Sequence, residues 1–186
     1  MPFSSGKYYP ETALGNTFIG STAVAGIKPS EDDATAIKFA LWNPRGSGKN
    51  LVVNTLAAGF VDTTSAAGNI GLSYQAGVGS QAATGGAVTA VTAVAPVNAK
   101  LGDGNSSVSI FAPATLTLAS GAAWLMAIGW NQLVTTAATT TAPGWDWYRD
   151  FDGSLIIPPD VLIAVTGPTA PLSNLNITIN WTEVPE

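Results

Sequence analysis

The C-terminal segment 174–183 alternates apolar and polar side chains without a break. Its apolar row is Leu175, Ile177, Ile179 and Trp181, and its polar row is Asn176, Thr178, Asn180 and Thr182. A period of two places one row against a core and the other toward solvent, so this segment predicts a half-buried β-strand. Several similar short runs occur along the chain, separated by Gly, Pro and Asn, and we find no convincing amphipathic helix. The pattern predicts an all-β sandwich or barrel.

Residues 35–42 carry the same alternation, with Ile37, Phe39 and Leu41 on one face. Residues 51–58 are rich in β-branched side chains and are expected to form the neighbouring strand. Further strands are predicted at residues 68–74, 106–111, 115–118, 124–134 and 161–166. No fixed-period repeat is visible, which argues against a propeller or a solenoid.

The length of 186 residues fits one domain with a proper core. Residues 1–30 are interrupted by Gly and Pro and are expected to form an extended N-terminal arm, or an early strand reached through loops. Residues 31–186 then form a single β-sandwich domain. Within it, residues 78–104 are a low-complexity stretch whose valines recur every three residues, so we expect a long insertion or loop there.

The composition excludes several classes of chemistry. The chain has no cysteine and no histidine, which removes thiolate sites, Ser-His-Asp catalysis and the commonest transition-metal ligand. Only 10% of residues are charged and the formal net charge is −5, so the basic surface that nucleic acids require is missing. The longest apolar run, residues 122–130, is too short to span a bilayer, and no secretory signal is visible. We expect no cofactor, no nucleic-acid partner and no membrane partner.

A nucleotide-binding loop is one interpretation of residues 43–50, Asn-Pro-Arg-Gly-Ser-Gly-Lys-Asn, but the segment lacks the residues that such a loop requires. A phosphate loop needs glycine where Asn43 stands, a hydroxyl where Asn50 stands, and a following helix rather than an apolar strand-like run. Proline and the two glycines instead predict a tight structural turn, either a hairpin or a β-corner. Arg45 and Lys49 place two cations on this corner, where they are candidates for contact with an acidic neighbour.

Acidic and aromatic residues gather between residues 145 and 153. Carboxylates among aromatic rings suggest a glycosidase, and the sequence Asp150-Phe151-Asp152-Gly153 resembles the start of a calcium loop. No acid is distinguished from its neighbours, however, and the bidentate glutamate of a calcium loop is missing. We therefore assign no catalytic residue and no metal ligand. The interpretation we favour is a loop packed on the core or on a partner, because aromatic anchors mark interfaces; a carbohydrate-binding platform is the alternative.

Two segments carry a family resemblance. Residues 41–53 combine Asn-Pro, Gly-Ser-Gly-Lys and an apolar strand, and residues 158–185 combine a Pro-Pro-Asp-Val-Leu-Ile strand, a Gly-Pro turn and a terminal strand that ends in Trp-Thr-Glu-Val-Pro. Both resemble small virion proteins of tailed bacteriophages. The resemblance implies a jelly-roll-like antiparallel β-sandwich that assembles as a homotrimer. It also implies a non-enzymatic capsid decoration (cement) protein that stabilises the lattice of the major capsid protein.

On this hypothesis the protein is made in the host cytoplasm and lies on the capsid surface of the virion. The candidate interface residues are Phe3, Tyr8, Tyr9, Arg45, Lys49, Trp145, Trp147, Tyr148 and Phe151. The alternative is a knob of a tail fibre or spike that binds a receptor or a host surface glycan through the same aromatic loop.

Overall fold

The computed structural model describes residues 6–31, 34–61, 68–79, 92–131, 135–136, 139–140, 147–167 and 174–186. Its elements, in chain order, are α1 (Tyr9–Ala13), β1 (Thr17–Ser21), β2 (Ser30–Glu31), β3 (Ala36–Ile37), β4 (Ala40–Asn43), β5 (Lys49–Phe60), β6 (Gly68–Ala76), β7 (Val97–Asn98), β8 (Ile110–Ala112), β9 (Leu116–Thr117), β10 (Ala123–Asn131), β11 (Thr135–Thr136), β12 (Thr139–Thr140), β13 (Trp147–Ile157), β14 (Val161–Gly167) and β15 (Leu175–Pro185). Within the described residues, no helix is long and apolar enough to cross a membrane.

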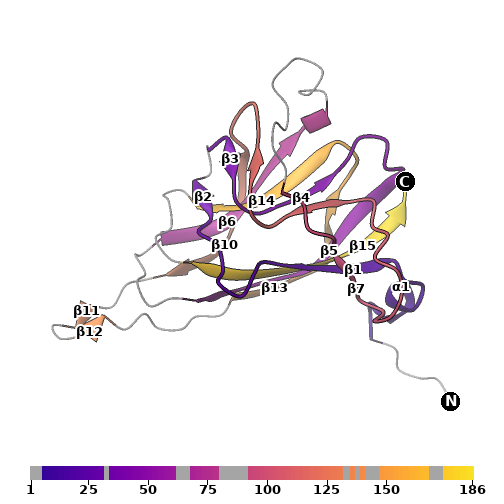
Figure 1. The fold of residues 1–186 in the computed structure, drawn as a ribbon, viewed down its shortest axis with the longest axis horizontal. Coiled ribbons are helices and arrows are strands. Elements are labelled where there is room, and N and C mark those ends of the chain that lie inside the picture. Colours follow the sequence, from indigo (N-terminus) through magenta and orange to yellow (C-terminus); the bar gives the residue numbers. More distant parts are fainter. Residues whose placement is uncertain are drawn as a thin grey trace.

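Two packed antiparallel sheets form the body of the molecule (Figure 1). The first sheet has the strand order β13-β5-β15-β1-β7, and the second has the order β10-β6-β14-β4-β8. Strand β2 adds to β14 in parallel, and two small ribbons, β3 with β9 and β11 with β12, lie outside the two main sheets. The all-β sandwich predicted from the sequence is confirmed.

The strands are connected as in an antiparallel ribbon that has been rolled up into a sandwich. Strand β1 pairs with β15, β4 with β14, β5 with β13, and β6 with β10, so each early strand meets a late one. Successive strands of this ribbon fall in opposite sheets, except for β6 and β10 at its closed end. This is the arrangement of an eight-stranded jelly roll, in which β7 and β8 extend one edge of each sheet.

The main core lies between the sheets. Trp181 is fully buried there, its ring centroid 6.2 Å from that of Phe18 and 6.3 Å from that of Phe111. A second, smaller apolar cluster covers the opposite face of the second sheet, where Leu162 and Ala164 of β14 pack against residues of β3 and β9. Strands β4 and β14 of the second sheet are therefore covered on both faces, whereas β10 of that sheet and the outer face of the first sheet are more open.

Strand β15 follows the predicted alternation closely. All four residues of its apolar row are buried, and Asn176, Thr178 and Asn180 are partly exposed. The expectation that Thr182 faces solvent is wrong, because a register shift follows Asn180 and the Thr182 hydroxyl, 4% exposed, accepts a hydrogen bond of 2.9 Å from Asn54 Nδ2.

The segment 43–50 forms a β-corner between the sheets. Strands β4 and β5 belong to different sheets, so the expectation that the segments before and after the turn pair directly is wrong. Gly46 and Gly48 adopt positive φ angles of 77° and 67°, as the turn chemistry predicts. The Asn43 amide donates hydrogen bonds to the carbonyl oxygens of Lys49 (2.7 Å) and Ile157 (2.9 Å), and so fixes the corner to the end of β13.

The predicted strand 35–42 is divided between two elements. Ile37 lies on β3 and packs in the second cluster, whereas Phe39 and Leu41 pack in the main core. The prediction that these three side chains share one face is therefore wrong, because the chain changes direction between β3 and β4.

Part of the first 30 residues belongs to the sandwich and does not form a free arm. Thr17–Ser21 is strand β1, paired along its length with β15, so the early-strand alternative applies here and the sandwich domain includes residues before 31. Tyr9–Ala13 forms helix α1 at the same end of the molecule as the C-terminus (Figure 1). Of the predicted insertion 78–104, residues 80–91 lie outside the described part, while Val97–Asn98 forms β7 and pairs with β1.

Candidate functional surfaces

The N-terminal segment is fixed to a bulge in β13. Lys7 Nζ lies 2.7 Å from Asp150 Oδ2 and 2.9 Å from Asp152 Oδ1, and the Tyr8 hydroxyl donates a 2.7 Å hydrogen bond to Asp150 Oδ1. The Lys7 ammonium also lies 4.8 Å from the centroid of the Tyr8 ring. The structure thus joins the predicted candidate Tyr8 to the acidic stretch of β13, two features that lie far apart in the sequence.

The bulge itself presents the two carboxylates. Asp150 pairs with Thr55 and Leu155 pairs with Val53, so the four residues 151–154 of β13 face the single residue Asn54 of β5. Asp152 and Gly153 have positive φ angles of 51° and 78°, which turn the chain outward at this point. A bulge on the edge strand of a sheet also hinders unspecific pairing with another strand.

These contacts shift the titration of the groups involved. The pKa of the Asp150 carboxyl falls from 3.8 to about 2, first because Lys7 donates a hydrogen bond to it and then because Tyr8 does. The pKa of Lys7 is raised by its hydrogen bonds to Asp150 and then Asp152. The pKa of the Tyr8 hydroxyl is raised, mainly by partial burial and then by Asp150.

We predict that acid releases the N-terminal segment from β13. The pKa of Asp150 is lower in the folded chain than in the unfolded chain, so this contact stabilises the attached segment above about pH 3.8 and is lost as the pH falls through about 2. NMR signals of Lys7 and Tyr8 followed from pH 7 to pH 1.5 should therefore change in this acid range. The Asp150→Asn variant should show the released signals already at pH 7, and an Asp103→Asn control should not. Unchanged Lys7 and Tyr8 signals in Asp150→Asn would contradict this prediction.

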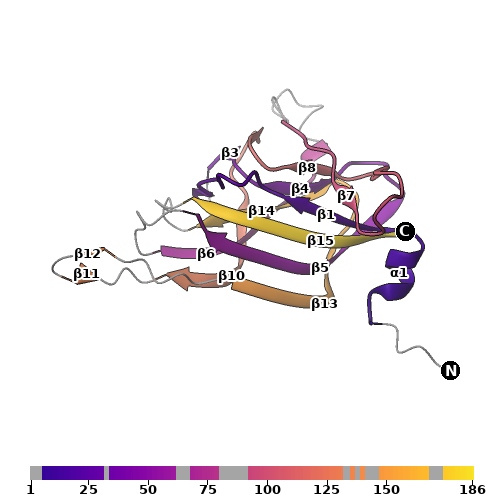
Figure 2. The ribbon, with the colours of Figure 1, turned by 60° about the horizontal axis from the view of Figure 1, so that its bottom comes forward.

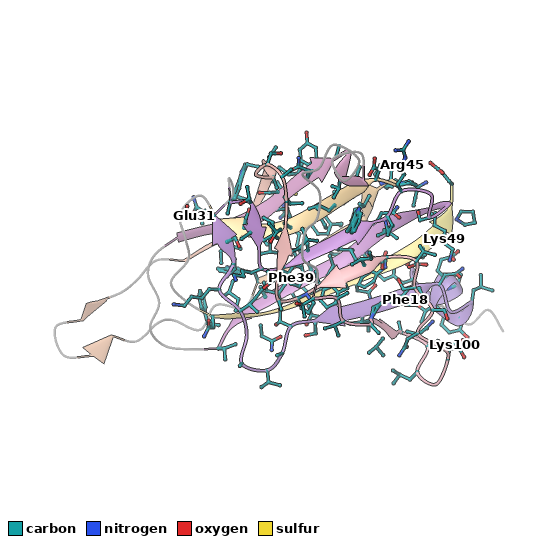
Figure 3. The ribbon with its side chains drawn as sticks, turned by 45° about the horizontal axis from the view of Figure 1, so that its top comes forward. Phe18, Glu31, Phe39, Arg45, Lys49 and Lys100 are labelled. Atoms are coloured by element: carbon teal, nitrogen blue, oxygen red, sulfur yellow. The ribbon has the colours of Figure 1, made fainter. Side chains whose placement is uncertain are left out.

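The two cations of the corner have different environments. Arg45 is exposed and projects from the corner (Figure 3). Lys49 Nζ instead lies 3.1 Å from Glu183 Oε2 of β15, whose side chain is fully buried. Glu183 Oε1 also accepts hydrogen bonds from the Ser107 hydroxyl and from the Val108 amide (3.0 Å). The acidic neighbour of Lys49 therefore belongs to this same chain, and Arg45 remains the exposed cation of the corner.

The aromatic candidates are divided between core and surface. Phe151 is 7% exposed and belongs to the main core, and Trp147 is half-buried with its ring in edge contact with Phe60 at 5.4 Å. Tyr148 and Tyr9 are exposed at 68% and 62%. Phe3 and Trp145 lie outside the described residues. Of the aromatic candidates that are described, Tyr9 and Tyr148 are thus the ones whose rings are largely free for contact.

An apolar cleft lies at the edge of the sandwich where β10 of one sheet comes close to β13 of the other. Figure 2 shows β10 and β13 at this edge. The volume of the cleft is about 270 Å³, and its walls come from β6, β10, β14 and the end of β13. Three of its apolar side chains are also exposed at the rim, Tyr74 at 41%, Leu125 at 42% and Ile156 at 54%. We call these walls and this rim the edge cleft.

The edge cleft is not predictable from the sequence pattern. Tyr74 continues the row of Ile70 and Leu72, and that row alone predicts a core position. Tyr74 is nevertheless 41% exposed, because it lies at the cleft, and no local pattern in the sequence predicts that cleft. The run Leu155-Ile156-Ile157 does indicate an apolar side chain outside the core. Successive side chains of a strand point to opposite faces, so three consecutive apolar residues place at least one on the outer face.

Among the described residues no group of three or more acidic side chains is placed to hold a metal ion. The features that define this molecule are therefore a jelly-roll sandwich, an attached N-terminal segment and the edge cleft. Comparisons with family models, curated proteins and solved structures found no match for the chain.

Proposed function

We propose that this chain is a non-enzymatic structural protein of a tailed-phage virion, a capsid decoration protein that trimerises and stabilises the lattice of the major capsid protein. The edge cleft is the observation that carries the proposal, because it is a concave apolar surface at the open edge of a jelly roll. Exposed apolar side chains that line one concave surface are suited to contact with another molecule. The resemblance of residues 41–53 and 158–185 to small virion proteins supplies the biological setting.

The proposed mechanism is burial of apolar surface between subunits. The rim residues Tyr74, Leu125 and Ile156 come from three strands in two sheets, so a partner seated there contacts both sheets at once. Each 100 Å² of apolar surface removed from water contributes about 2.5 kcal/mol. A protein that binds only the assembled lattice opposes loss of that lattice by mass action.

The sparse charge of the chain is consistent with such packing. With 19 charged side chains among 186 residues, seven basic and twelve acidic, a neighbouring copy meets little electrostatic repulsion. Two of these charges, those of Lys49 and the buried Glu183, are paired with each other within the chain.

We predict that a charge in the edge cleft abolishes lattice binding without unfolding the chain. Ile156→Asp and Leu125→Asp each place a carboxylate on the exposed rim, where contact with a partner would remove it from water. Affinity for capsid shells stripped of this protein should fall at least about tenfold, equivalent to about 1.4 kcal/mol. Leu101→Asp is the matched control, since Leu101 is 83% exposed and lies away from the cleft.

Cosedimentation with stripped shells measures the effect. Wild type and Leu101→Asp should sediment with the shells, and the two cleft variants should stay in the supernatant with unchanged unfolding midpoints. Failure of the wild type to bind shells would contradict the proposed function. Normal binding of both cleft variants would instead show that the contact lies elsewhere on the protein.

A further inference from the structure

The outer face of the first sheet carries a row of small and polar side chains in register. Tyr148 of β13 pairs with Ala57 of β5, Ala57 with Thr178 of β15, and Thr178 with Ser21 of β1. Directly paired residues of a sheet point to the same face. The face therefore presents an aromatic ring on one edge strand, a methyl group next to it, and two hydroxyl groups beyond.

The adjoining pair in this face is Gly59 with Asn176. Because Gly59 has no side chain and Ala57 has only a methyl group, the sheet is hollowed between Tyr148 and the β15 residues. The result is a groove of about 390 Å³, with Tyr148 and Trp147 on one side and Asn176 and Thr178 on the other. None of its described lining residues carries a charge.

The side-chain amide of Asn176 makes only long hydrogen bonds within the described part of the protein. Asn176 Oδ1 lies 3.5 Å from the Ser21 hydroxyl, and Asn176 Nδ2 lies 3.4 Å from the carbonyl oxygen of Ala23. Both distances are at the long limit of hydrogen bonding. The amide is therefore able to donate to and accept from a ligand at little cost, while the Thr178 and Ser21 hydroxyls are 2.9 Å apart and orient each other.

A ligand that fits these walls needs a flat apolar face and several neutral hydrogen-bonding groups on its rim. A pyranose ring has both, because its axial C–H groups pack on an aromatic ring and its equatorial hydroxyls reach amide and hydroxyl side chains. We propose that this groove binds a neutral saccharide, with Tyr148 as the stacking platform and Asn176 and Thr178 as the polar contacts. This inference is independent of the proposed lattice function, since the groove and the edge cleft have different linings.

The test uses the isolated protein and immobilised neutral oligosaccharides, including maltohexaose, cellohexaose and chitohexaose, together with acidic polygalacturonate. We expect binding to at least one neutral glycan. Tyr148→Ala should lower that affinity at least about tenfold, and Asn176→Ala should lower it several-fold. Tyr148→Phe should retain it, because the ring is kept. Tyr9→Ala is the matched control, since Tyr9 is 62% exposed and Tyr148 is 68% exposed.

Three results would overturn the inference. They are no binding to any neutral glycan, binding to polygalacturonate alone, and neutral-glycan binding that Tyr148→Ala and Asn176→Ala both leave unchanged. The unfolding midpoint of each variant is the control for folding. Both midpoints should equal that of the wild type, because Tyr148 and Asn176 lie on the outer face of the sheet.

Discussion

Trp181→Ala is expected to lower the free energy of unfolding by about 3–5 kcal/mol, the usual cost of deleting a large aromatic side chain from a core. Trp181 is fully buried near the centre of the sandwich, and its ring neighbours Phe18 of β1 and Phe111 of β8. These two rings come from opposite sheets, so the cavity left behind weakens the contact between the sheets. Denaturation in urea, followed by circular dichroism, measures the change.

Two further variants sharpen the Trp181 experiment. Trp181→Phe should lose much less stability than Trp181→Ala, because Trp181 Nε1 has no hydrogen-bond partner among the described residues and only ring volume is lost. Trp124→Ala is the matched tryptophan control, since Trp124 is 37% exposed. An equal loss in Trp124→Ala and Trp181→Ala would contradict the central place of Trp181 in the core.

Lys49→Met is expected to lower the free energy of unfolding by about 3 kcal/mol, at the low end for breaking a buried ion pair. Glu183 has no exposed side-chain surface, and its carboxylate loses the one cation paired with it in the part of the chain that the structure describes. Lys49 itself is one third exposed, so water reaches the site and keeps the loss from being larger. Ser107 and Val108 still donate hydrogen bonds to Glu183 in the variant, but they carry no charge.

The double variant Lys49→Met, Glu183→Gln separates the ion pair from the packing of Lys49. Removal of both charges should restore part of the lost stability, and a double-mutant cycle gives the coupling. Lys100→Met is the control, because Lys100 and Asp103 form an exposed pair at 2.9 Å that is worth at most about 1 kcal/mol. A loss in Lys49→Met no larger than in Lys100→Met would contradict a structural role for the Lys49–Glu183 pair.

The fold class was predictable because strand alternation is local. The period of two in residues 174–183 identified the central strand β15, and the Asn-Pro-Gly turn chemistry identified the corner before β5. Sheet membership was not predictable in the same way. Whether β5 pairs with β4 or crosses to the other sheet depends on contacts between residues far apart in the chain, such as those of β5 with β15.

The candidate surfaces were predictable only in part, for the same reason. The aromatic stretch 147–151 was identified, but its sequence does not show that Phe151 turns into the core while Tyr148 stays exposed. The partner of Lys49 is Glu183, and the partner of Tyr8 is Asp150; each pair is separated by more than a hundred residues. Exposure of Tyr74 depends on how β6, β10, β13 and β14 pack around the edge cleft, which is a property of the whole sandwich.

Electron microscopy of the virions that carry this chain is the decisive test of the proposed function. The proposed function predicts density for the jelly roll as trimers over three-fold positions of the capsid, with the edge cleft against a neighbouring subunit. Density for the chain on the tail, or absence of the chain from purified particles, would contradict it.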